Sequence, residues 1–121
     1  MANHHCQVLV VTCIDFRFQE YINKWISENL KPGSFDRVAF AGCVKNFETI
    51  MGQIRISKKL HDIHKVILIN HEDCGAYGEE GTREKQTQDL QAAPQKIKSE
   101  FPALEVQTLY LHLDGTFEKV G

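Results

Sequence analysis

Three residues with metal-binding side chains stand where buried segments of the chain end. Cys13 lies at the end of the apolar segment QVLVVTCI, and His71 and Cys74 follow the apolar segment KVILIN. The loop His71-Glu72-Asp73-Cys74 has the spacing H-x-x-C, which lets an imidazole and a thiolate bind one ion. Two thiolates and one imidazole form the three-ligand set of an open zinc site, whereas magnesium and calcium prefer oxygen ligands. The sequence therefore predicts a zinc site at Cys13, His71 and Cys74.

A second motif follows directly from the first of these cysteines. If the segment CIDFR is extended, Cys13, Asp15 and Arg17 lie on one side of it. Arg17 can then hold the Asp15 carboxylate through charge-assisted hydrogen bonds. Without a metal, the two residues form a structural ion pair. Beside a metal, Asp15 can accept a hydrogen bond from metal-bound water or hydroxide.

The fourth ligand of such a site is left open by the sequence. Water, Asp15 or Cys43 could occupy it, because Cys43 follows the second predicted strand and adds a thiol near the expected site. Four further histidines have simpler interpretations. The two near the N-terminus are expected to be solvated, and the two near a helix end can interact favourably with the helix dipole when they are charged. They are His4, His5, His61 and His64.

The apolar pattern predicts strands that alternate with helices. Strands are expected over 7–14, 35–41, 65–70 and 106–113, helices over 18–30, 46–60 and 82–100, and a short hairpin arm over 116–120. Pro94 is expected to kink the last helix or divide it in two. This alternation predicts an α/β fold, with a mainly parallel central sheet of four to five strands and helices on both faces. A single domain is expected over residues 1–121.

The predicted fold brings the candidate ligands together. In open parallel sheets, ligands bind beyond the carboxyl ends of the strands. Cys13 follows the first predicted strand, Cys43 the second, and His71 the third. The expected site is therefore at one edge of the sheet.

Composition excludes several classes of protein. The chain has 121 residues, 14 basic and 16 acidic side chains, and a formal charge of −2. This balance predicts no basic face for nucleic acid, and no apolar run approaches the length of a membrane span, about 20 residues. The first residues lack the pattern of a signal peptide, so we expect a cytoplasmic protein with reduced thiols.

The two motifs together resemble those of the β-class carbonic anhydrases. CIDFR and HEDC are similar to the family's C-x-D-x-R and H-x-x-C motifs, and PGSFDRVAFAG, KVILINHEDCGAY and YLHLDGTFEKV resemble further family segments. The chain departs from the family pattern in having AFAG in place of R-N-A-G, Ser34 in place of an acidic residue, and Asn70 in place of the glycine before His71.

This resemblance implies a function. Cys13, His71 and Cys74 would be the zinc ligands, and Asp15 and Arg17 the catalytic pair that orients the hydroxide. In some members the matching Asp instead binds zinc and closes the site. The implied reaction is zinc-dependent, reversible hydration of carbon dioxide to bicarbonate by a zinc-bound hydroxide, in a homodimer or higher homo-oligomer. The proton shuttle is not identified; His112 or a buffer molecule could serve.

Three alternatives remain at this point. Relatives with the same ligands hydrolyse carbon disulfide or carbonyl sulfide, so the substrate could be another small linear molecule. A non-catalytic zinc protein would use Asp15 or Cys43 as a permanent fourth ligand. A metal-free thiol enzyme built on Cys13 is the weakest alternative, because Arg17 follows too soon for the phosphate loop of a cysteine phosphatase.

Overall fold

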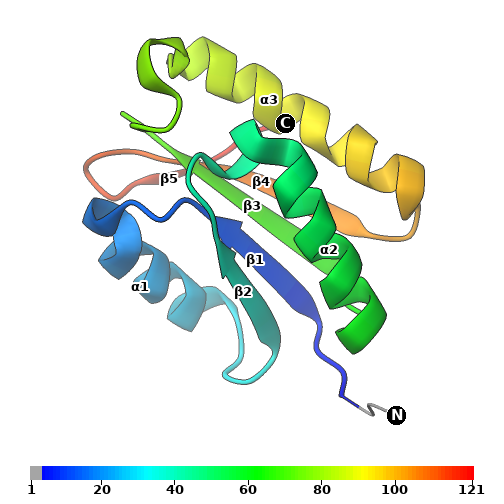
Figure 1. The fold of residues 1–121 in the computed structure, drawn as a ribbon. Coiled ribbons are helices and arrows are strands. Elements are labelled where there is room, and N and C mark those ends of the chain that lie inside the picture. The colour runs from blue at the N-terminus through cyan, green and yellow to red at the C-terminus, as the bar shows by residue number, and fades with distance from the viewer. Residues whose placement is uncertain (1–3) are drawn as a thin grey trace.

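Five strands form one sheet in the computed structural model, which describes residues 4–121 (Figure 1). The strand order is β2-β1-β3-β4-β5; the first four run parallel, and β5 pairs antiparallel with β4. The strands are β1 (Val8–Thr12), β2 (Phe35–Ala39), β3 (Lys65–His71), β4 (Glu105–Leu111) and β5 (Phe117–Lys119). The predicted mainly parallel sheet of four to five strands is confirmed.

The central strands are buried on both faces because their side chains alternate between two apolar clusters. In β1, Leu9 and Val11 join one cluster, while Val8 and Val10 join the other. Three helices cover these faces, namely α1 (Gln19–Asn29), α2 (Phe47–His61) and α3 (Arg83–Glu100). Helix α1 packs on one face, and α2 and α3 pack on the opposite face (Figure 1).

The path of the chain forms a topological switch point between β1 and β3, which is where open α/β sheets have their binding crevice. These strands are neighbours in the sheet, yet the helix after β1 lies on one face and the helix after β3 lies on the other. At such a point the two connections diverge, and ligands of α/β sheets bind beyond the carboxyl ends of the strands there. Cys13 follows β1 directly, and His71 is the last residue of β3.

Helix α3 corrects one prediction. Pro94 lies inside α3, which is continuous from Arg83 to Glu100, so the predicted division of this helix is wrong. Leu90 and Ile97, on either side of Pro94, are fully buried in the same cluster. Packing of this apolar face thus outweighs the local cost of the proline.

The sequence led us to expect no membrane span, and the helices can be compared with the length and hydropathy that a span requires. None of the helices within residues 4–121 is both long enough and apolar enough to cross a bilayer.

Replacement of the helical proline tests this balance. We expect Pro94→Ala to raise the free energy of unfolding by about 2 kcal/mol, since an interior proline costs about 3 kcal/mol relative to alanine, and its rigidity in the unfolded chain offsets up to about 1 kcal/mol. Urea unfolding measures the change. Pro102→Ala, outside the helices, is the control and should shift stability by less than about 0.5 kcal/mol. A Pro94→Ala protein no more stable than the wild type would contradict the interpretation.

Candidate metal centre

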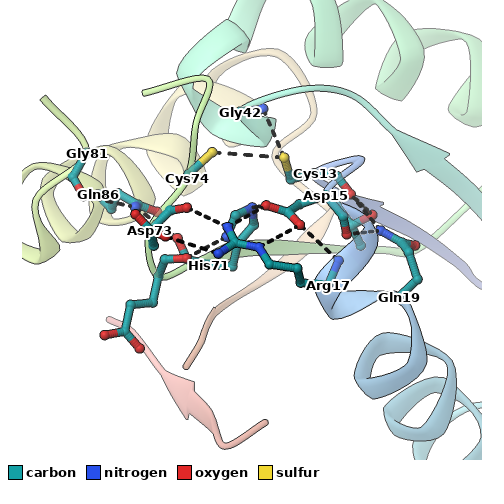
Figure 2. Close-up of polar contacts among 12 residues, drawn as sticks. Cys13, Asp15, Arg17, Gln19, Gly42, His71, Asp73, Cys74, Gly81 and Gln86 are labelled. Carbon is teal, nitrogen blue, oxygen red and sulfur yellow. Dashed lines mark hydrogen bonds and ion pairs between the residues drawn. The ribbon is translucent and has the colours of Figure 1, made fainter. Parts of the chain in front are cut away.

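The switch point between β1 and β3 brings the three predicted ligands together. The Sγ atoms of Cys13 and Cys74 and a ring nitrogen of His71 all lie within 4.8 Å of one another. All three side chains are buried, each with 5% or less of its surface exposed. Figure 2 shows these side chains converging from the segment after β1 and from the end of β3.

The His71 ring is oriented for binding by contacts on its other side. Its Nδ1–H donates to the carbonyl oxygen of Glu72 at 2.8 Å, which leaves Nε2 as the nitrogen with a free lone pair. The ring also stacks on Phe18, with 4.2 Å between ring centroids. Nε2 is buried and has no hydrogen-bond partner. A buried, unpaired polar atom is costly, so this nitrogen is arranged to receive a ligand.

The two cysteine side chains are in hydrogen-bond contact. Their Sγ atoms are 3.9 Å apart, and hydrogen bonding with Cys74 lowers the pKa of Cys13 in spite of burial. The same contact, together with burial, raises the pKa of the Cys74 thiol. The Gly42 N–H adds a hydrogen bond of 3.3 Å to Cys13 Sγ. A divalent cation bound here would hold both sulfurs as thiolates.

The site has the dimensions and donor chemistry of a tetrahedral zinc site. With Zn–S distances of about 2.3 Å, two thiolates of a tetrahedral zinc lie about 3.8 Å apart. The observed separation of 3.9 Å between Cys13 and Cys74 matches this value. The residues therefore fit the metal, because they supply two soft sulfurs at this separation and one unpaired imidazole nitrogen.

The neighbouring pair Asp15–Arg17 is formed, although not in the extended backbone that we predicted. Phe16–Phe18 is a 3₁₀ turn, and Asp15 caps it by accepting the Arg17 backbone N–H at 2.9 Å. The Arg17 side chain folds back along this turn and donates from Nε and Nη2 to the two Asp15 oxygens, at 3.1 and 2.7 Å. These hydrogen bonds lower the pKa of Asp15, which keeps the carboxylate ionised.

Arg17 also bridges the two motifs. It donates from Nη1 to Asp73 Oδ2 at 3.0 Å and from Nη2 to the Asp73 carbonyl oxygen at 2.9 Å (Figure 2). Asp73 lies between His71 and Cys74 and has a left-handed backbone, with φ of 57°. One guanidinium thus fixes both the Asp15 carboxylate and the loop that carries Cys74.

Asp15 and Cys43 differ in their relation to the three ligands. Asp15 Oδ2 lies 3.9 Å from His71 Nε2, beside the ligand group rather than within it. Cys43 is fully buried on the α2 side of the sheet, where its thiol contacts the Val11 carbonyl oxygen at 3.5 Å. Within residues 4–121, the group of mutually close ligand atoms therefore includes neither Asp15 nor Cys43.

Several supporting residues were not identified from the sequence. Gln19 donates to the carbonyl oxygens of Cys13 and Asp15, and Gln86 donates to the carbonyl oxygen of His71 at 2.9 Å. Their amides bind backbone carbonyl oxygens, and no sequence motif marks such contacts.

Asn70 and Gly42, both in segments that we compared with the family pattern, also have clear structural roles. Asn70 donates to the Tyr77 hydroxyl, which in turn donates to Asp89 at 2.8 Å, so this polar chain braces the loop after β3.

Gly42 has φ of 85°, and a Cβ there would lie 3.2 Å from the Ala76 side chain. A glycine is thus required where the backbone approaches Cys13.

Apolar side chains remain exposed beside the centre. Ile14 and Phe16, which alternate with the motif residues, are 59% and 85% exposed, and Phe40 after β2 is 37% exposed. The Phe40 N–H donates to the Thr12 carbonyl oxygen at 2.8 Å, which places it at the end of β1. An exposed apolar rim of this kind is typical of a binding surface.

Comparisons with known proteins agree with the fold and with the family resemblance. Residues 3–121 match the model of a family described as "Putative carbonic anhydrase". An uncharacterised protein of Rickettsia bellii is 31% identical over 136 residues, covering 97% of this chain and 83% of its own length.

Solved structures show the same fold. The β-carbonic anhydrase isoform I of Trichomonas vaginalis has a TM-score of 0.70 at 15% identity, covering 99% of this chain and 86% of its own. The carbonic anhydrase of Streptococcus mutans has a TM-score of 0.69 at 15% identity, covering 100% and 86%.

Removal of one thiol tests the ligand set. After dialysis against a weak chelator, we expect the wild type to retain about one zinc per chain and Cys74→Ser to retain almost none, because a hydroxyl does not replace a thiolate ligand. Elemental analysis measures the metal. Cys6→Ser is the matched control, since Cys6 lies before β1 at the other end of the sheet. Full zinc occupancy in Cys74→Ser would rule out this ligand set.

Proposed function

Because the chain belongs to this carbonic anhydrase family, we propose that it catalyses the reversible hydration of carbon dioxide to bicarbonate, with zinc held by Cys13, His71 and Cys74. The observation that carries the proposal is the buried His71 Nε2, which has no partner and lies within 4.8 Å of two cysteine sulfurs. A purely structural crevice would not leave this nitrogen unpaired. The β-class fold of the chain adds support.

Each side chain has a distinct part in this proposal. When bound, zinc supplies Lewis acidity and lowers the pKa of a coordinated water, which provides the nucleophile. Cys13, His71 and Cys74 would hold the metal, and the ionised Asp15 carboxylate lies beside them, with Oδ2 at 3.9 Å from His71 Nε2. Its carboxylate would accept a hydrogen bond and so orient the attacking group toward carbon dioxide.

Arg17 keeps Asp15 available for this role. A carboxylate free to rotate would be attracted to the cation and would occupy the fourth position. The guanidinium fork holds both Asp15 oxygens and is itself fixed by Asp73. Lysine could not reproduce this geometry, because its ammonium is a point charge without a planar fork. Arg17 is thus the positioning residue of the proposed mechanism.

The pocket for carbon dioxide is proposed to be completed by a second copy of the chain. Strand β2 is an edge strand, and the adjacent apolar rim of Ile14, Phe16 and Phe40 is exposed in the isolated chain. A second copy would cover these side chains and supply an apolar wall for an apolar substrate. The structure of two β-carbonic anhydrases from Sordaria macrospora is described as tetrameric, which makes assembly a reasonable expectation here.

The thiols favour a reducing compartment such as the cytoplasm. All four cysteines are free, and the Sγ atoms of Cys13 and Cys74 are 3.9 Å apart. Oxidation would join these two sulfurs and remove the ligands, so we propose that the protein works where thiols stay reduced.

The Asp15–Arg17 pair gives a direct test of catalysis. We expect Arg17→Ala and Arg17→Lys to keep zinc but lose most activity, and Asp15→Asn to lose about tenfold to a thousandfold, as for other positioned polar groups. Stopped-flow carbon dioxide hydration with parallel zinc analysis measures both effects. Wild-type activity should rise from about pH 7 to 9, as expected for an attacking group that must be deprotonated.

Arg55→Ala is the matched control for this experiment. Arg55 makes a similar fork to Glu100, with contacts of 2.8 and 3.0 Å, but on the helices of one face rather than at the crevice. The Arg55→Ala protein should retain full activity. A zinc-loaded wild type that is inactive across this pH range would refute carbon dioxide hydration, and an active Arg17→Ala protein would refute the role of the pair.

Assembly is tested by changing the apolar rim. We expect the wild type to sediment as a dimer or larger oligomer at micromolar concentration, and Phe16→Ser to shift it toward monomer with a loss of activity. Leu60→Ser is the control, because Leu60 is also an exposed apolar side chain but lies near the end of α2, away from the Cys13 centre. A wild-type monomer with intact activity would contradict the shared pocket.

A further inference from the structure

A second group of metal-binding side chains lies at the opposite end of the sheet from the Cys13 centre. His5, Asp62 and His64 each offer one ligand atom, and these atoms lie within 4.8 Å of one another at an exposed position. Asp62 follows α2, and His64 directly precedes β3. The group therefore lies at the amino end of the strand whose carboxyl end carries His71.

The two imidazoles face each other at a separation suited to one cation. His5 Nε2 and His64 Nε2 are 3.3 Å apart, and the two rings are inclined by 62°. Two nitrogens bound to one tetrahedral zinc at about 2.0–2.1 Å lie about 3.3–3.4 Å apart. The spacing thus allows both nitrogens to bind one ion with little movement.

The backbone beside each histidine is already fixed. The Cys6 N–H donates to the His61 carbonyl oxygen at 3.1 Å, and the His64 N–H donates to the Gln7 carbonyl oxygen at 2.9 Å. These bonds hold the segment that carries His5 against the connection between α2 and β3. A ligand set held in place in this way loses little conformational freedom when it binds an ion.

The third member of the group is a carboxylate with one oxygen available. Asp62 lies at the C-terminal end of α2 with a left-handed φ of 50°, and its backbone N–H donates to the Lys58 carbonyl oxygen. Lys58 Nζ donates to Asp62 Oδ1 at 2.7 Å and to the Ile63 carbonyl oxygen at 3.2 Å. Within residues 4–121, Oδ1 is the Asp62 oxygen that accepts a hydrogen bond from Lys58, and one carboxylate oxygen of Asp62 lies within 4.8 Å of both histidine nitrogens.

We propose that His5, Asp62 and His64 form a second metal site, which takes a divalent cation of the zinc type and clamps the N-terminal segment to the start of β3. Two imidazoles and one carboxylate suit zinc, nickel or copper better than magnesium or calcium, which prefer oxygen ligands alone. The three exposed side chains leave the remaining positions to water. The clamp would join residues 59 positions apart in the chain.

A nearby group is less suited to bind a metal. Cys6, Asp36 and His61 are also mutually close. However, Asp36 Oδ2 already accepts a hydrogen bond from Ser57 Oγ at 2.6 Å and pairs with His61 Nδ1 at 2.6 Å. A cation there would have to displace both partners, whereas the His5 group needs only the loss of one contact between two imidazoles.

Calorimetric titration with zinc tests the second site. The protein is first loaded at the Cys13 centre, and additional zinc is then titrated into the wild type, His5→Ala, His64→Ala and Asp62→Asn. We expect one further equivalent in the wild type. Each variant should bind it at least about tenfold more weakly, since even groups that only support metal ligands are worth about 10–100-fold in affinity. Asparagine also tolerates the left-handed backbone of Asp62.

His4→Ala and Cys6→Ser are the matched controls and should bind the further equivalent as the wild type does. Cys74→Ser should also bind it, which separates this site from the proposed catalytic centre. Loss of the equivalent in Cys6→Ser would assign it to the Cys6 group and overturn the proposal. A wild type without further binding, or a His5→Ala/His64→Ala protein that binds normally, would overturn it as well.

Discussion

The structure depends most on one buried nitrogen that the protein itself leaves unsatisfied. His71 Nε2 is shielded from solvent and has no hydrogen-bond partner, at a cost of about 1–3 kcal/mol for a polar group of this kind. The opposite ring nitrogen is bonded to Glu72, and Phe18 fixes the plane of the ring. These contacts keep the nitrogen beside two sulfurs that lie 3.9 Å apart, and a cation would satisfy all three atoms together.

Sheet topology explains why these groups meet, and one arginine explains how they are held. Because α1 and α3 lie on opposite faces, the connections after β1 and β3 diverge and leave room for buried polar side chains. Arg17 closes the outer side of this space by binding Asp15 and the Asp73 loop at once. The same contacts that position the carboxylate also anchor the segment that carries Cys74, so local order and proposed catalysis have a common origin.

Sequence reasoning was most successful for the buried strands, because a short run of apolar residues has one clear physical explanation there. The apolar segments of β1 and β3 predicted buried parallel strands, and the expected position of Cys13 and His71 at the ends of these strands placed them side by side.

Sequence reasoning was wrong about the backbone around Asp15, because a 3₁₀ turn brings Arg17 back to the carboxylate as an extended strand would not. It was also wrong about a division of α3 at Pro94, where burial of Leu90 and Ile97 outweighs the proline. The roles of Gln19 and Gln86 depend on hydrogen bonds to backbone carbonyl oxygens, and the role of Asp73 depends on the distant Arg17 side chain; no local pattern encodes these contacts.

The central claim is an open metal centre with two sulfur ligands and one imidazole. X-ray absorption at the zinc edge of the loaded wild-type protein, after weakly bound metal has been removed, tests it most directly. We predict two sulfurs at about 2.3 Å, one imidazole nitrogen at about 2.0–2.1 Å and one further light atom. A third sulfur would show that Cys43 has joined the shell. A shell without sulfur would place the metal elsewhere, and either result would contradict the proposed centre.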